Sequence, residues 1–82
     1  MKAEDREAVA DSLEAIAETA AGVKIYAEIV PRYAEAGNLP GLRHAVRCMV
    51  AHIRACRGGM QALETVLAAR AARDGDISND GA

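Results

Sequence analysis

The sequence contains no phenylalanine and no tryptophan, and its only aromatic residues are Tyr26 and Tyr33. Aromatic side chains supply much of the area that a small domain buries. Alanine accounts for 19 of the 82 residues, and it brings helix propensity with little buried surface. The composition therefore predicts a helical chain with a small core.

Other features are scarce as well. Ten basic and twelve acidic residues give a net charge of −2, so nucleic acid is an unlikely partner for a chain without a basic excess. No apolar run approaches the roughly 20 residues of a membrane span, and Met1–Asp5 does not resemble a signal peptide. Cys48 and Cys56 are too few for a disulfide framework. We therefore expect a soluble, cytoplasmic protein without a membrane partner.

The first part of the chain carries one apolar stripe at helical spacing. Between Ala3 and Ala36 the spacing alternates between four and three residues, which is the period of a coiled-coil seam. The stripe consists of Val9, Leu13, Ile16, Ala20, Val23, Ala27 and Val30. It stops at residues 37–41, where Gly, Asn and Pro are typical of a turn.

A second stripe with the same alternating spacing follows the turn. It consists of Leu42, Val46, Met49, Ile53, Cys56, Met60, Leu63, Leu67 and Arg70. Eight consecutive matches predict one long helix over about residues 42–73. Residues 74–82 are acidic and show no periodicity, so we expect a disordered tail there.

Two long helices joined by a short turn predict an all-α fold, an antiparallel helical hairpin within one domain over residues 1–73. The first helix is expected over about residues 3–36. A compact four-helix bundle, with breaks at Gly22 and at Gly58–Gly59, is the alternative. Neither position has enough turn residues to reverse the chain, so we favour continuous helices.

Several large apolar residues lie outside both stripes, and four of them fall within residues 25–33. A helix that is apolar on two faces needs a second neighbour. The simplest neighbour is another copy of the chain, which would give a dimeric four-helix bundle. The expected interface consists of Ile25, Tyr26, Ile29, Tyr33 and Val50.

Charge is divided between the two helices. Residues 1–31 hold seven acidic side chains, whereas residues 42–57 hold four arginines and no acid. We expect these arginines to pair with the acidic helix, within the hairpin or across a dimer. A docking strip for phosphates or for an acidic protein is the second interpretation. The strip consists of Arg43, Arg47, Arg54 and Arg57. The acidic helix also leaves open a mimic of a nucleic-acid backbone.

Histidine and cysteine alternate along the second helix at four-residue intervals, as His44, Cys48, His52 and Cys56. Neighbours four apart can reach one metal ion, and both residue types bind Zn²⁺. Four such positions rotate around a helix, however, so one chain offers at most one pair. We therefore expect no cofactor, and we keep a metal-binding bundle that uses His52 and Cys56 as the alternative.

No nucleophile–base–acid spacing, phosphate loop or metalloprotease motif occurs in the sequence. The prediction is a non-catalytic protein–protein interaction module that binds itself and another protein. A small inhibitor or accessory factor, of the kind that phages and mobile elements encode, would fit this size and composition.

Overall fold

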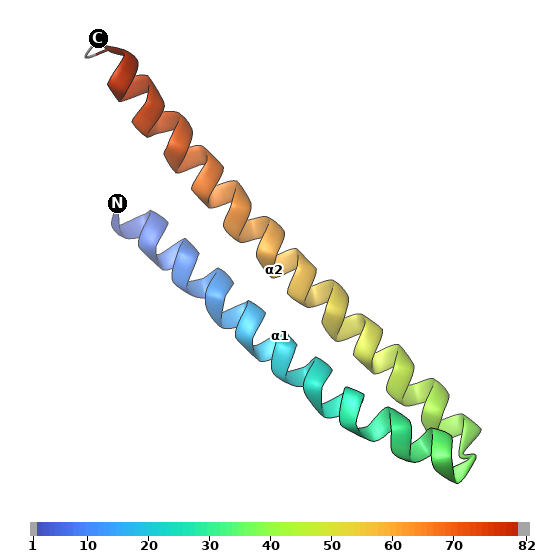
Figure 1. Cartoon of the computed structure of the whole chain (residues 1–82). Helices are drawn as coiled ribbons and strands as arrows, with labels where there is room; N and C mark the ends of the chain where they lie inside the picture. The colour runs from blue at the N-terminus through green and yellow to red at the C-terminus, as the bar shows by residue number, and fades with distance from the viewer. Residues whose placement is uncertain (1, 81–82) are drawn as a thin grey trace.

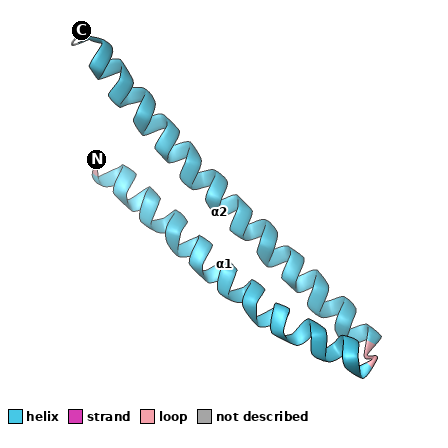
Figure 2. Ribbon diagram, viewed as in Figure 1, coloured by secondary structure: helices cyan, strands magenta, loops and turns pink. Residues whose placement is uncertain are grey.

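The computed structural model describes residues 2–80 and contains two helices. Helix α1 spans Ala3–Ala36 and helix α2 spans Leu39–Asp80. They run antiparallel and side by side, with both chain ends at one end of the molecule and the turn at the other (Figures 1 and 2). The molecule is a rod with extents of 66 × 19 × 13 Å. The predicted all-α antiparallel helical hairpin is confirmed.

Both helices pass through the residues that were candidate breaks. Gly22 lies inside α1, and Gly58–Gly59 lies inside α2, without interrupting either helix. Pro31 also lies inside α1. The compact four-helix arrangement within one chain is therefore not formed.

The turn is shorter than the predicted residues 37–41, because α2 already begins at Leu39. Gly37 ends α1 in the left-handed conformation, with φ of 67°, which glycine adopts without steric cost. The Asn38 N–H donates to the Tyr33 carbonyl (3.0 Å), and the Asn38 Oδ1 accepts from the Gly41 N–H (3.0 Å). Asn38 thus closes α1 with its backbone and caps α2 with its side chain.

The far end of α2 also differs from the expectation. The helix continues to Asp80, so the boundary predicted after residue 73 is not a helix end. Arg73 forms an ion pair with Asp5, which joins α2 to the first turn of α1. Arg70 and Asp74, one turn apart on α2, lie 3.7 Å from each other. Residues 81–82 of the predicted tail lie outside the described residues.

The surface between the helices, which we call the inner seam, consists mainly of small and polar side chains. Its buried and half-buried members on α1 are Ala8, Ser12, Ala15, Thr19, Gly22, Tyr26, Ile29 and Tyr33. On α2 they are Ala45, Met49, His52, Cys56, Gly59, Leu63 and Val66. Small residues at this spacing allow the two backbones to approach closely.

Glycine is required where the helices approach most closely. A Cβ atom at Gly22 would lie 2.0 Å from the nearest atom of the His52 ring, so the imidazole rests directly on the α1 backbone. At Gly59 a Cβ atom would lie 3.0 Å from Ile16 Cγ1. The hairpin is therefore joined by large side chains that sit against glycine.

The predicted seam of α1 contacts α2 only along one edge: Ile16 lies against Gly59, and Val9, Val23 and Val30 are half-buried as well. Leu13 belongs to the predicted stripe but is 52% exposed, while its neighbour Ser12 is buried. The helix is rotated so that its small residues face α2, its row of Val9, Ile16, Val23 and Val30 lies half-buried at the edge of the contact, and its row of Leu13, Ala20 and Ala27 faces outward. As a result the described side chains form almost no core: Ala45 and Leu63 are the buried apolar ones, and none of the large side chains among them is fully buried.

Candidate functional site

The outward-turned apolar residues of both helices form one continuous surface, which we call the open face. Its rows repeat every seven residues, so they stay on one side of a two-helix hairpin. From α1 the rows are Val9, Ile16, Val23 and Val30, and Leu13, Ala20 and Ala27. From α2 the row is Leu39, Val46, Ile53, Met60 and Leu67. All five α2 residues and Leu13 are large hydrophobic side chains that remain exposed.

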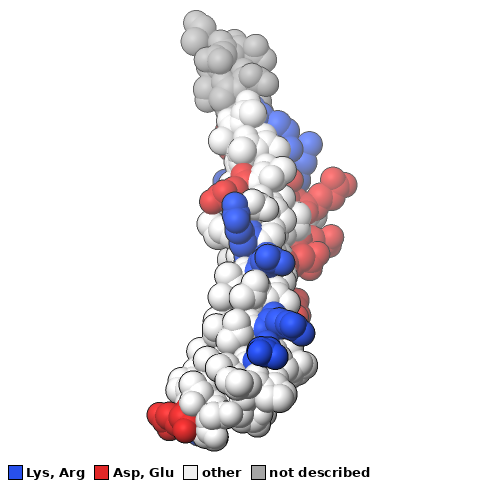
Figure 3. All heavy atoms as spheres, turned by 90° about the vertical axis from the view of Figure 1, so that its right-hand side faces the viewer, with Lys and Arg blue, Asp and Glu red and all other residues white. Residues whose placement is uncertain are grey.

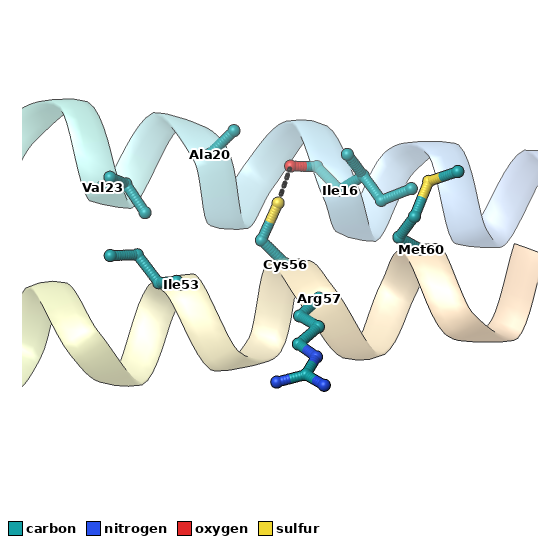
Figure 4. A pocket seen from close by; sticks show the side chains of 7 residues that line it. All are labelled: Ile16, Ala20, Val23, Ile53, Cys56, Arg57 and Met60. Carbon is teal, nitrogen blue, oxygen red and sulfur yellow. Dashed lines mark hydrogen bonds between the residues drawn. The ribbon is translucent and has the colours of Figure 1, made fainter.

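A groove of about 540 Å³ lies at the middle of the open face. Figure 4 shows Ile16, Ala20 and Val23 of α1 on one side, and Ile53, Cys56, Arg57 and Met60 of α2 on the other. The small side chains of Ala20 and Cys56 leave the hollow, and larger apolar side chains border it. Arg57 is its only charged residue and points away from α1 (Figure 4). Such a surface suits another apolar surface better than a polar ligand.

The five residues predicted as the dimer interface do not form one surface. Tyr26, Ile29 and Tyr33 are half-buried in the inner seam, where Tyr33 lies over Gly41. Ile25 is 56% exposed, but it follows Ile16 by nine residues, which is two and a half helical turns. Ile25 therefore lies on the side of α1 opposite the open face. Val50 is half-buried on α2, one turn before Ile53 and Arg54.

Tyr26 belongs to a small polar cluster with residues of α2. Its ring lies 5.4 Å from the His52 ring, centroid to centroid, at an angle of 42°. A hydrogen bond with the Cys48 thiol raises the pKa of Tyr26 above its ordinary value, and the charge of a Cys48 thiolate and partial desolvation raise it further. Cys48 Sγ also lies 3.6 Å from His44 Nε2. The cluster connects the two helices near the turn.

His52 and Cys56, the two candidate metal ligands, both make contacts within the hairpin. His52 Nδ1 lies 2.8 Å from the Cys48 carbonyl oxygen and donates to it, while the other side of the ring rests on Gly22. Cys56 Sγ lies 4.0 Å from the Ile16 carbonyl oxygen (Figure 4). Within the described part of the chain, no three His, Cys, Asp or Glu side chains gather as a metal site would require.

All four residues of the arginine strip, Arg43, Arg47, Arg54 and Arg57, are exposed. The ion pairs among residues 2–80, Arg70–Asp74 and Arg73–Asp5, include none of them. Pairing of the strip with α1 inside one hairpin is therefore not observed. Figure 3 shows basic side chains following one another along one face of the molecule; several acidic side chains lie along its right edge, and others lie at the lower left and beside the upper basic side chains.

Helix geometry explains where several of these charges lie. Asp11, Glu14 and Glu18 are each nine residues from a member of the open face, so they lie on the opposite side of α1. Arg57 follows Ile53 by one turn, and Arg43 follows Leu39 by one turn, so these arginines border the open face. The border of the open face on α2 thus carries Arg43 and Arg57 together with Glu64, which follows Met60 by one turn, while Asp11, Glu14 and Glu18 of α1 face away.

The fold and this surface define a class of structure, a helical hairpin with one uncovered apolar face. No protein family, characterised protein or solved structure matches the chain. Neither helix, over the residues searched, has an apolar stretch long enough to cross a membrane.

Proposed function

We propose that this chain is a non-catalytic protein–protein interaction module that works as a homodimer, with the open face as the dimer interface. The observation that carries the proposal is the location of the large apolar residues. Of the seven large hydrophobic residues that remain exposed among the described ones, all but Ile25 lie on one outer face, while the inner seam is made mostly of small and polar residues. A second copy would give these side chains the core that one hairpin lacks.

The exposed area supports the same conclusion. A compact monomer of 8.6 kDa would expose about 4,700 Å². This chain exposes 5976 Å², so the excess is about 1,300 Å², and a standard interface buries about 800 Å² on each partner. The radius of gyration of 19.0 Å likewise exceeds the roughly 12 Å of a globular chain of this length. The chain thus exposes more area than a compact monomer by an amount comparable to one side of a standard interface.

The charge pattern favours this face over the opposite one. The rows of the open face carry no charge between Leu13 and Val30, whereas the opposite side of α1 holds Asp11, Glu14 and Glu18. Two acidic faces would repel each other, because like charges at an interface oppose association.

Recognition of another protein is a second part of the proposal. Arg43 and Arg57 of the arginine strip border the open face, and none of the four arginines has an acidic partner among the side chains that the structure describes. Arginine binds carboxylates through two parallel hydrogen bonds, so an acidic protein surface would suit it. A small inhibitor or accessory factor that acts by surface binding fits this arrangement.

The test compares two isoleucines of similar exposure on opposite sides of the hairpin. Ile53 is 47% exposed on the open face, and Ile25 is 56% exposed on the other side. We expect Ile53→Asp to weaken dimerisation at least about 30-fold, because the dimer would bury an unpaired carboxylate. Ile25→Asp should leave the association constant within about threefold. Sedimentation equilibrium of both variants and the parent chain measures this difference.

A parent chain that sediments as a monomer at 100 µM (~6 kcal/mol of association free energy) would overturn the proposal. Loss of the dimer in Ile25→Asp, with the dimer retained in Ile53→Asp, would place the interface on the opposite face. Circular dichroism of each variant checks that the helices persist.

A further inference from the structure

The open face can pair with a second copy in two ways. A symmetric dimer requires a two-fold axis that lies in the plane of this face. If the axis runs along the rod, the two turns lie at the same end, and α1 of each copy lies against α2 of the other. If the axis runs across the rod, the turns lie at opposite ends, and each helix lies against its own counterpart.

We infer that the two copies pair with their turns at the same end, so that α1 packs against α2 of the second copy. This inference rests on the proposed function, because it assumes that the open face is the dimer interface. It adds the orientation of the partner, which the open face of a single hairpin specifies through the sizes and charges of its rows.

Side-chain size is the first argument. The α2 row consists of large residues, among them Ile53 and Met60, whereas the α1 rows contain Ala20 and Ala27 near the middle of the helix. Pairing each helix with its own counterpart would set large rows against large rows on one side, and alanines against alanines on the other. Because side-chain size sets the distance between packed helices, this arrangement leaves one pair too far apart. Pairing α1 with α2 sets the large α2 row against the α1 row that contains Ala20 and Ala27 on both sides.

The arginine strip gives a second, independent argument. Arg57 lines the outer α2 edge of the groove, and the groove lies at the middle of α1, between Ile16 and Val23. With an axis across the rod, Arg57 would therefore come close to Arg57 of the second copy, and Arg54 would lie beside them. Like charges placed together in this way oppose association. With an axis along the rod, Arg57 would instead face Ala20 and Leu13 of the second copy, and its methylene groups would cover their surface.

The experiment measures distances between spin labels in the dimer. Ala36 and Glu4 are exposed residues near opposite ends of α1, and each is replaced by cysteine in a chain that carries Cys48→Ala and Cys56→Ala. Labels at residue 36 of both copies should lie within about 25 Å of each other when the turns are at the same end, because packed helices are 8–10 Å apart. When the turns are at opposite ends the separation is about 50 Å, the length of α1 at 1.5 Å per residue.

A mixed sample gives the reciprocal measurement. Copies labelled only at residue 36 are combined with copies labelled only at residue 4, and we expect the distance between unlike labels to be about 50 Å. A short distance in this sample, with a long one between residues 36, would overturn the orientation while the homodimer stands. A monomeric mass for the parent chain would overturn both proposals. Loss of the short distance on dilution with unlabelled chain would confirm that the pair is intermolecular.

Discussion

The inner seam and the open face are two apolar strips on the same pair of helices, and they differ in what they contain. The inner seam brings the helices together over Gly22, Ala45 and Gly59, and its polar members include Ser12 and His52. The open face carries exposed Leu, Ile, Met and Val side chains. The surface with more hydrophobic free energy to gain is thus the one that a single chain leaves in water. The seam fixes the shape of the hairpin, and the open face supplies the reason to associate.

A matched pair of leucines one turn apart tests this comparison most directly. Leu63 is buried in the inner seam at 9% exposure, whereas Leu67 is 41% exposed on the open face. If a second copy covers the open face, Leu67→Ala and Leu63→Ala should each lower the free energy of unfolding by about 2–4 kcal/mol per chain, since both truncate a covered side chain. Urea unfolding at 100 µM chain (~6 kcal/mol of association free energy) gives both values.

The same measurement at low concentration sharpens the contrast. When the chain is diluted below the dissociation constant of the dimer, Leu67→Ala should lower the free energy of unfolding by less than about 1 kcal/mol, because an exposed side chain contributes little. If the cost of Leu67→Ala does not change with concentration, the open face is not covered by a second copy.

The close approach at the inner seam is tested by two glycines. Gly22→Ala should destabilise the hairpin by about 1–3 kcal/mol, because the new methyl group would overlap the His52 ring. A Cβ atom at Gly58 meets nothing within 4 Å, so Gly58→Ala should stabilise α2 by about 0.5–1 kcal/mol through helix propensity. Thermal unfolding of the two variants checks the opposite signs, and a stabilised Gly22→Ala would mean that the helices are further apart.

The smallest expected effect concerns Tyr26 at the turn end of the seam. The Cys48 contact raises the pKa of Tyr26, which favours the neutral phenol in the folded chain. Its contribution to stability is therefore complete below the ordinary pKa of tyrosine and is lost as pH rises through the higher pKa of the folded chain. Cys48→Ala should lower the pKa of Tyr26 toward the ordinary value of 10.0.

Absorbance titration of phenolate in a Tyr33→Phe background isolates Tyr26 for this measurement. Cys56→Ala is the matched control, since Cys56 contacts the Ile16 carbonyl oxygen rather than Tyr26. An unchanged pKa in Cys48→Ala would show that the thiol does not act on the phenol.

Much of the fold follows from periodicity in the sequence. The alternating spacing from Val9 to Val30 predicts one long helix, and the glycine, asparagine and proline of residues 37–41 mark the reversal. The rotation of α1 does not follow from periodicity, because two parallel stripes of the helix are both compatible with it. We expected the more apolar stripe of α1 to pack against α2. Close contact at Gly22 and Gly59 instead favours the stripe of small residues at this position.

The candidate site was predicted only in part for the same reason. The apolar residues of α2 on the open face, such as Ile53 and Met60, belong to the predicted second stripe, but Leu39 was placed in the turn. Tyr26 and Tyr33 were expected at an outer interface because residues 25–33 are apolar on two faces of the helix, yet both fill space inside the hairpin. Their partners, His52 and Gly41, depend on the register that the two-residue turn imposes, and a single sequence does not reveal that register.

A chain with so little interior has few positions at which one replacement opens a cavity. Outside the tight glycine contacts and the buried Leu63, most residues are free to change identity as long as their class is kept. Over evolutionary time the amino-acid sequence of such a chain changes quickly, while the seven-residue spacing of its apolar rows persists. Descendants of this hairpin should therefore resemble it in pattern long after pairwise identity has faded.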